Sequence, residues 1–316
     1  MTNRNRNIEE RPPDWPAWNS DILSVRSDTS WRAKYRLLQS WYRQMVIKAP
    51  AGRYRGRYRG NHLIPEWVAK DPHANFLTQE VSNYVDARLP EVTAQGGVME
   101  ETRLRGNLLS SHPLCFNLFG QLRAFPEHAA TVLGTSFDLD IEIITAIEVE
   151  WAPNPAKHLG DRTAFDAYVE YTTSNGRRGF IGIETKYTEN FTQQDYDRPE
   201  YRSVTEDPAS GFKPGAADVL KARSTNQLWR NSLLAASVRK KEGFDVGHVW
   251  VLACKGDRTL TRAVKTFEGQ MDDPRSLLRV ANFEDLIAEA LKFPDLAEWA
   301  SAFDSRYLDL SQIDMT

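Results

Sequence analysis

The chain has 316 residues, of which 41% are hydrophobic and 11% aromatic, so it can bury a sizeable core. No segment approaches the roughly eighteen apolar residues of a membrane span, and the polar, proline-rich N-terminus lacks a signal-peptide pattern, so we expect no membrane association. Two cysteines in apolar contexts, Cys115 and Cys254, and six histidines without zinc-binding spacing predict a cytoplasmic protein with reduced, buried thiols and no structural zinc.

Charge is distributed unevenly along the chain, although the net charge is only −3. Residues 1–60 contain thirteen lysines and arginines against five acidic residues, whereas residues 257–316 contain seven against twelve. A basic end of this kind indicates a surface that can bind a polyanion.

The first predicted helix begins near Asp28, Thr29 and Ser30, which are good N-terminal caps. Apolar side chains then recur at helical spacing and predict a stripe that faces the core, formed by Trp31, Tyr35, Leu38, Tyr42 and Met45. Pro50 lies just past the end of this helix.

Arginines alternate with tyrosines and glycines over residues 52–60, which we interpret as a loop. Its four arginines can pair with phosphates, and its tyrosines can stack on bases. These arginines are Arg53, Arg55, Arg57 and Arg59. Two interpretations stay open here: contact with a nucleic acid, or an exposed segment whose charges only keep the protein soluble.

Residues 74–89 and 99–109 have helical patterns separated by a Gly-Gly breaker. Pro113 can open a further helix that runs to about Ala124 and carries five large apolar residues, which should pack on a sheet. Residues 140–151 alternate as a strand, with glutamates on its less apolar face. For Glu148 and Glu150 both a solvated position and an approach to a metal ion stay open.

A β-hairpin over residues 164–188 carries the chemistry. Because strand side chains alternate between faces, one face should hold Phe165, Ala167, Val169 and Tyr171 and the other should hold Asp166. On the second strand Glu184 and Lys186 share a face with Phe180 and Gly182. Each strand therefore has an apolar face and a face that bears a carboxylate.

The turn decides whether the two carboxylates meet. A three-residue loop, Ser174-Asn175-Gly176, places glycine where the left-handed conformation is needed and sets Asp166 opposite Glu184. A two-residue Asn-Gly loop would shift the register by one residue and put the two carboxylates on opposite faces. We expect the three-residue loop.

Two carboxylates opposite each other on one face repel, unless a cation lies between them. Mg²⁺ takes oxygen ligands and commonly binds one or two carboxylates together with substrate phosphates. The alternative is a solvated sheet face on which Glu184 and Lys186 form an ordinary surface pair.

The C-terminal half begins with a polar segment, residues 189–215, which we interpret as a long loop. A helix should follow, with Ser224 as its cap and Gln227 completing a capping box, and Gly243 should end it. A strand over 245–254 and a second one near 277–280 come next, before two short helices that are separated by a proline. The core order is therefore helix, three strands, helix, strand, which predicts a mixed sheet with helices on both sides.

Several stretches resemble the PD-(D/E)XK nuclease superfamily, in its bacterial restriction-endonuclease-like branch. They are Arg162-Thr163-Ala164-Phe165-Asp166-Ala167, the run from Arg178 to Tyr187 that contains Glu184-Thr185-Lys186, and the run from Arg103 to Gly120. The resemblance covers about residues 30–290. One departure is Phe165, which stands where the family often has a proline.

The resemblance implies an α/β, restriction-endonuclease-like core with an N-terminal helical extension, and we place the boundary between residues 1–95 and residues 96–316. It implies that Asp166, Glu184 and the backbone carbonyl of Thr185 hold Mg²⁺, with Mn²⁺ as a substitute, and that Lys186 completes the catalytic set. By motif position, Glu101 is the candidate for a further metal ligand; a helix-surface glutamate is the alternative.

The expected function is metal-dependent hydrolysis of phosphodiester bonds by an endonuclease, most simply in DNA, with RNA left open. On this interpretation the arginine-rich loop and Gln227 would contact the nucleic acid. A restriction, antiviral defence or repair role, a larger complex and oligomerisation are open contexts. The alternative function is a catalytically silent nucleic-acid-binding or assembly subunit on the same fold.

Overall fold

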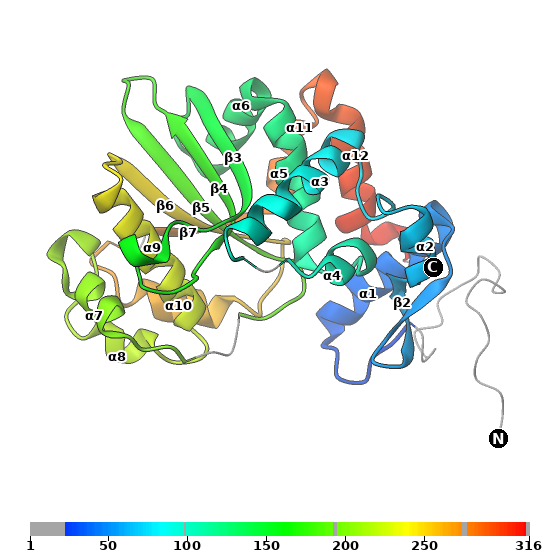
Figure 1. Ribbon diagram of the computed structural model, residues 1–316, viewed down its shortest axis with the longest axis horizontal. Coiled ribbons are helices and arrows are strands. Elements are labelled where there is room, and N and C mark those ends of the chain that lie inside the picture. The colour runs from blue at the N-terminus through cyan, green and yellow to red at the C-terminus, as the bar shows by residue number, and fades with distance from the viewer. Residues whose placement is uncertain (1–22, 98, 192–194, 274–276, 314–316) are drawn as a thin grey trace.

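The computed structural model describes residues 23–97, 99–191, 195–273 and 277–313. It contains a five-stranded mixed sheet between two layers of helices, and a separate two-stranded hairpin beside it (Figure 1). The elements in chain order are α1 (Ser30–Tyr42), the π-helix η2 (Arg43–Ile47), β1 (Ala51–Tyr54), β2 (Arg57–Leu63), α2 (Pro65–Lys70), α3 (Gln79–Ala94), α4 (Glu101–Gly106), α5 (Ser111–Ala124), α6 (Pro126–Phe137), β3 (Ile143–Trp151), the 3₁₀ turn η3 (Pro155–Lys157), β4 (Phe165–Thr172), β5 (Arg178–Lys186), α7 (Pro199–Glu206), the 3₁₀ turn η4 (Pro208–Ser210), α8 (Ala216–Leu220), α9 (Asn226–Lys241), β6 (Val246–Ala253), α10 (Thr261–Glu268), β7 (Leu278–Asn282), α11 (Phe283–Ala290), α12 (Pro294–Tyr307) and the 3₁₀ turn η5 (Leu310–Gln312).

The large sheet has the strand order β3-β4-β5-β6-β7. The pairs β3–β4 and β4–β5 are antiparallel, whereas the pairs β5–β6 and β6–β7 are parallel. The predicted core order of helix, three strands, helix and strand is confirmed, with α9 as the crossover between the parallel strands β5 and β6. This α/β architecture makes β4 and β5 interior strands, covered on both faces.

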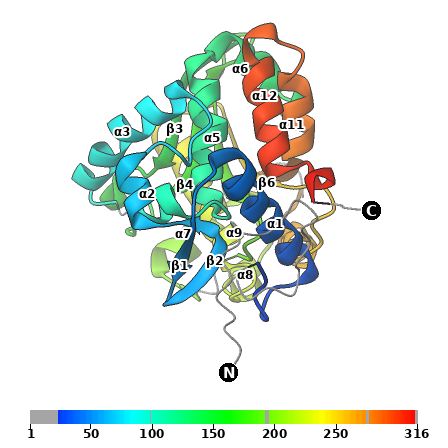
Figure 2. The same cartoon turned by 90° about the vertical axis from the view of Figure 1, so that its right-hand side faces the viewer.

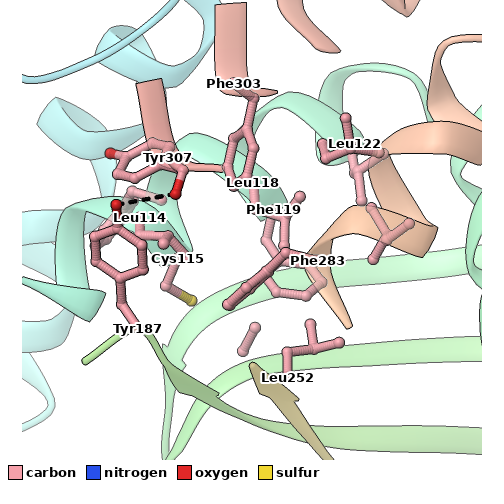
Figure 3. Packing of buried hydrophobic residues seen from close by; sticks show 14 of the residues in the cluster. Leu114, Cys115, Leu118, Phe119, Leu122, Tyr187, Leu252, Phe283, Phe303 and Tyr307 are labelled. Carbon is pink, nitrogen blue, oxygen red and sulfur yellow. Dashed lines mark hydrogen bonds between the residues drawn. The ribbon is translucent and has the colours of Figure 1, made fainter. Parts of the chain in front are cut away.

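One layer of helices, chiefly α5, α6, α11 and α12, packs on one face of the sheet (Figures 1 and 2). Phe119, Phe283 and Phe303 come from three of these helices and meet over Leu252 of β6 (Figure 3). The Tyr187 hydroxyl donates a hydrogen bond to the Tyr307 carbonyl oxygen at 3.0 Å, which ties the end of β5 to α12 (Figure 3). The second layer, chiefly α7, α8, α9 and α10, covers the opposite face.

The β4–β5 hairpin has the three-residue loop that the sequence predicts. Gly176 has a φ of +79°, and the Thr173 amide donates to the Arg177 carbonyl oxygen at 2.9 Å. The strands pair Ala167 with Ile183 and Thr172 with Arg178, as the three-residue loop requires, and the pairing begins one residue after Asp166. The predicted register is therefore confirmed.

The arginine-tyrosine segment is a β-hairpin, and the prediction of a loop is wrong. Arg55 and Gly56 have φ values of +49° and +77° and form a two-residue turn between β1 and β2. The alternation of arginine and tyrosine reflects the two faces of a strand. The hairpin is anchored by an antiparallel bridge between His62 and Asn107, and by a 3.0 Å hydrogen bond from the Leu108 amide to the Asn61 carbonyl oxygen.

Other predicted elements need correction. The stripe on α1 does not reach Met45, which is 46% exposed, because the helix continues as a π-helix and rotates this residue outward. The polar segment 189–215 is not a long loop throughout, because it contains α7. Helices α6 and α10 were not predicted at all. A bulge in β3 near Thr145 turns Ile143 outward, so it is not part of the buried face.

The larger hydrophobic cluster includes residues on both sides of the predicted boundary at residue 95, such as Leu38, Val85, Leu118 and Phe303. The division into 1–95 and 96–316 remains a prediction about the chain's organisation. Cys115 and Cys254 are buried and reduced, as predicted. Among the described residues, no helix combines the length and the apolar character needed to cross a lipid bilayer.

Candidate active site

Glu184 and Lys186 lie at the end of β5, and Asp166 lies at the start of the adjacent strand β4. Lys186 Nζ is 2.8 Å from Glu184 Oε1. Glu184 is only 3% exposed and Lys186 6%, because α9 packs over this face. The alternative of a solvated surface pair is therefore wrong: this is a buried ion pair at one end of the sheet.

Two amides from α9 hold Glu184 on both of its oxygens. Gln227 Nε2 donates to Oε1 at 2.7 Å, and Asn231 Nδ2 donates to Oε2 at 2.7 Å. Residues four apart lie on the same side of a helix, so α9 presents both amides to one carboxylate. Hydrogen bonds to an ionised acceptor are among the stronger ones in proteins, and these fix the Glu184 side chain in one orientation.

The predicted capping role of Gln227 is wrong. Thr225 occupies the N-cap position of α9, and no side chain makes a capping hydrogen bond there. The Gln227 amide therefore reaches the hairpin, where its Oε1 also accepts from Lys186 Nζ at 3.2 Å. Asn231 was missed altogether. The spacing Gln227-x-x-x-Asn231 was the available signal, because it places two amides on one face of the predicted helix.

Phe165 lies on the opposite face from the one that the alternation of β4 predicts. Its ring packs over Gly182, where a Cβ atom would lie 2.5 Å from Phe165 Cε1. The ring continues a row of stacked aromatic side chains that includes Trp151 and Tyr168, with the ring centroids of this pair 4.2 Å apart. The strand departs from regular alternation at its first residue, which leaves Asp166 beside Thr185.

Asp166 accepts two hydrogen bonds on a single oxygen. The Thr185 amide and the Thr185 hydroxyl donate to Oδ2 at 2.7 Å and 2.9 Å. Burial, followed by the negative charges of Glu184 and Glu150, raises the pKa of Asp166 well above its usual value. The site therefore concentrates negative charge that a cation would relieve.

Lys186 is held in its protonated form. Burial by itself would lower the pKa of Lys186, but the charges of Glu184 and Asp166 outweigh this effect and raise it. The ammonium group also lies 5.2 Å from the centre of the Phe191 ring. A lysine in this environment supplies a fixed positive charge and hydrogen-bond donors; it is not a general base at neutral pH.

Glu150 is a third carboxylate near Asp166, from the neighbouring strand β3. It has a φ of +53°, although the residues on either side, Val149 and Trp151, pair regularly with β4. Positive φ at a non-glycine residue in a strand stores strain, and such strain clusters at functional sites. Glu150 Oε1 lies 3.1 Å from His112 Nε2, at the start of α5.

Glu101 lies elsewhere on α4. Its carboxylate accepts from Arg105 Nε at 2.7 Å, and its side chain is 57% exposed. None of the ion pairs or hydrogen bonds that the described residues make with Glu101 involves Asp166, Glu184 or Lys186. Its predicted role as a metal ligand therefore has no support from these contacts, and the helix-surface alternative fits them.

Cys115 contacts β4 from the other helical layer. Its thiol donates a hydrogen bond to the Asp166 carbonyl oxygen at 3.3 Å. Burial, with added repulsion from the charge of Asp166, raises the pKa of Cys115 well above its usual value. The thiol therefore stays protonated and braces α5 against β4.

The order of the core elements agrees with a comparison to family models, in which the PD-(D/E)XK nuclease superfamily matches residues 26–309. The chain belongs to the PD-(D/E)XK nuclease superfamily. Searches of curated proteins and of solved structures give no significant match. Membership rests on nearly the whole chain and confirms the fold that the sequence resemblance implies.

Nucleases of this superfamily typically use divalent metals. In the part of the chain that the structure describes, no three His, Cys, Asp or Glu side chains converge as a complete ion-binding cluster. Mg²⁺ does not need such a cluster, because it commonly binds one or two carboxylates and completes its shell with water and substrate phosphates. Asp166 and Glu184 fit this requirement.

Proposed function

We propose that this superfamily member is a metal-dependent endonuclease that hydrolyses phosphodiester bonds, with DNA as its substrate. The observation that carries the proposal is the buried pair of Glu184 and Lys186 at the end of β5, with the half-buried Asp166 at the start of the adjacent strand β4. A purely structural role would not call for repelling carboxylates in a buried place, since their mutual repulsion costs stability.

Asp166, Glu184 and the carbonyl oxygen of Thr185 would hold Mg²⁺ or Mn²⁺. Both hydrogen bonds that Asp166 accepts from described residues are on Oδ2, so Oδ1 remains available as a ligand. When bound, such an ion polarises a phosphate and lowers the pKa of a coordinated water. Glu101 keeps a place among the candidate ligands only as a sequence prediction, because its contacts lie with Arg105.

Lys186 would orient the attacking water and stabilise the negative charge that develops on the phosphate. Its raised pKa keeps the ammonium group charged at neutral pH, and burial makes that charge more effective than it would be in water. Gln227 and Asn231 would act as positioning residues, because each reaches the reaction through Glu184. The earlier idea that Gln227 contacts nucleic acid is thereby replaced by a role in orienting the glutamate.

The arginines of the β1–β2 hairpin would contact the substrate backbone. Arg53 makes two contacts with one tyrosine side chain: its guanidinium lies 4.3 Å from the centre of the Tyr58 ring, and its Nη2 donates to the Tyr58 hydroxyl at 3.1 Å. Arg55 lies farther from a ring, 5.3 Å from the centre of Tyr54, and Arg59 donates to the Tyr58 carbonyl oxygen at 3.1 Å. We therefore propose phosphate contacts for Arg55, Arg57 and Arg59, and a role within the hairpin for Arg53.

The test is cleavage of linear and circular DNA by the purified protein with Mg²⁺, with Mn²⁺ and with EDTA. We expect nicking or cutting that needs the metal and that is lost in Asp166→Asn, a change that keeps the size of the side chain. Asp295→Asn, at an exposed carboxylate on α12, is the matched control and should cut normally. Cleavage that survives EDTA or Asp166→Asn would contradict the mechanism, and binding without cleavage under all conditions would favour the silent binding protein.

A further inference from the structure

A cavity of about 600 Å³ lies between the β1–β2 hairpin, the start of α1, α4 and the segment after β5. The main groups on its wall are Arg55, Arg57, Arg59, Arg103, Tyr54 and His62, and we call it the arginine cavity. Its size falls within the roughly 300–1,000 Å³ that is typical of small-molecule sites. In Figure 1, α4 lies between the large sheet and this hairpin, and Figure 2 shows the hairpin beside α1.

The arginine cavity adjoins the candidate active site through Glu189, which also lines its wall. Glu189 follows Lys186 by three residues, so their Cα atoms are at most about 11 Å apart. That distance corresponds to about three stacked nucleotides at 3.4 Å each. Glu189 is fixed by the Ser111 amide, which donates to its Oε1 at 2.9 Å, and this holds the wall close to α5.

The wall is positively charged. Six arginines line it against three carboxylates, and two of those arginines, Arg32 and Arg36, lie within 3.4 Å and 2.5 Å of Asp28. Among the described residues, Arg55 and Arg57 have no carboxylate within ion-pair distance. Guanidinium groups without a protein carboxylate partner are well suited to bind phosphate.

The wall also offers flat rings. Tyr54 is 50% exposed, its ring stacks on His62 with centroids 5.4 Å apart, and the Arg55 guanidinium lies 5.3 Å from the centre of the same ring. Burial, followed by the charges of Arg36 and Arg59, lowers the pKa of His62 to about 4, so this ring is neutral at physiological pH. An exposed tyrosine supported from behind by a second ring can stack on a nucleobase without regard to its sequence.

We propose that the arginine cavity binds one nucleotide of the substrate strand, with arginines on its phosphate and Tyr54 against its base. The inference rests on the proposed nuclease function, and it adds a subsite whose nearest wall, at Glu189, follows Lys186 by three residues. A nucleotide is the ligand that needs anion recognition and ring stacking within one cavity of this size. The site would bind the strand and orient it toward Lys186.

The experiment measures binding of a fluorescent 12-nucleotide oligodeoxythymidylate by anisotropy, in the Asp166→Asn protein without divalent metal. Arg55→Ala combined with Arg57→Ala should weaken binding at least ten-fold and reduce the slope of log K against log salt by about 1.4, since each single-strand phosphate contact contributes about 0.7. Arg53→Ala removes a charge from the same hairpin outside the cavity wall, and we expect a change of less than about two-fold.

Two further variants test the contribution of stacking and of the cavity's open volume separately from that of its charge. Tyr54→Ala should weaken binding about ten-fold without changing the salt slope, because stacking releases no counterions. Thr102→Trp fills the cavity from an exposed position on its wall and removes no charge, and it should weaken binding by a similar factor. Circular dichroism of each variant establishes that the fold is retained.

The outcomes separate this inference from the proposed function. If the parent protein neither binds nor cuts DNA, the proposed function fails and the subsite fails with it. If the protein cuts DNA but the cavity variants bind like Arg53→Ala, the subsite alone is overturned. If thymidine 5′-monophosphate binds as tightly as the oligonucleotide and competes with it, the cavity is a site for free nucleotides and the strand assignment is wrong.

Discussion

The β4–β5 hairpin and the β1–β2 hairpin both turn through a left-handed glycine, Gly176 in one and Gly56 in the other, yet their surroundings are opposite. The first lies inside a five-stranded sheet with helices on both faces, and the second forms a two-stranded sheet of its own. In the first, Glu184 is held by Lys186 and two amides. In the second, arginines lie exposed beside a cavity.

This contrast separates two physical requirements. A catalytic carboxylate must keep its position within a fraction of an ångström, which needs packing and several hydrogen bonds. A surface that follows a flexible polyanion needs charge and stacking more than a fixed geometry. Substitutions at β4–β5 should therefore change the rate of cleavage, and substitutions at β1–β2 should change binding and its dependence on salt.

The largest effect is expected at Lys186. Lys186→Met keeps the aliphatic chain and removes the charge, and it should lower kcat by at least about 10²–10³-fold, the range for loss of one preorganised charge-stabilising group. DNA binding in the absence of metal should change little. The measurement is single-turnover cleavage, with Lys292→Met, at an exposed position just after α11, as a control. A kcat within three-fold of the parent would remove Lys186 from the mechanism.

A smaller effect is expected at Asn231, which orients Glu184. Asn231→Ala leaves the buried Oε2 of Glu184 without its donor, a loss of about 1–3 kcal/mol, so kcat should fall about ten-fold. Its neighbour on α9, Ser232, is equally buried, and Ser232→Ala provides the control. Steady-state kinetics should show the loss in kcat and not in KM. A loss confined to KM would make Asn231 part of the binding surface and weaken the contrast between the hairpins.

The smallest effect concerns stability. Because the pKa of Asp166 is raised in the folded protein, folding favours its protonated form. Its contribution to stability is therefore fully present below the unfolded pKa near 3.8 and is lost as pH rises through the folded value. Asp166→Asn should thus raise the free energy of unfolding at pH 7, and the gain should disappear as the pH falls below the unfolded pKa.

Urea unfolding of both proteins across this pH range, without divalent metal, measures the gain. The same change at an exposed position, Asp295→Asn, should give no pH-dependent gain. A destabilised Asp166→Asn protein at pH 7 would mean that the negative charge of Asp166 stabilises the folded state. The argument that a cation relieves repulsion between the carboxylates would then lose its physical basis.

The sequence contains enough information for the catalytic hairpin because its register depends on local chemistry. The loop ending in Gly176 fixes which residues of the two strands pair with each other. Period-two alternation then places Glu184 and Lys186 on the same face of β5. Alternation fails at Phe165, because the ring occupies the space above Gly182, which is available only where a partner strand lacks a side chain. The position of Gly182 beside Phe165 depends on the pairing of β4 with β5, so the sequence of β4 alone does not predict which way the Phe165 ring turns.

The partners of the catalytic residues were harder to predict for the same reason. A glutamine three residues after a serine is typical of a capping box, but the structure directs Gln227 across to β5, where a buried carboxylate is a stronger acceptor. Glu101 was predicted to be a metal ligand from its position in a motif. Its separation along the chain from Asp166 and Glu184 does not determine where its side chain lies relative to them in the fold. The arginine-rich segment was read by composition as a loop, although its strict alternation is typical of a strand.

The hydrogen bond from the Cys115 thiol to the backbone of Asp166 has a practical consequence. With both cysteines buried, a thiol reagent can react only after a local opening of the fold, so its rate of reaction serves as a clock for such openings. Comparing the labelling rate of Cys115, on α5 beside β4, with that of Cys254, directly after β6, would measure local opening at the two positions separately within one molecule.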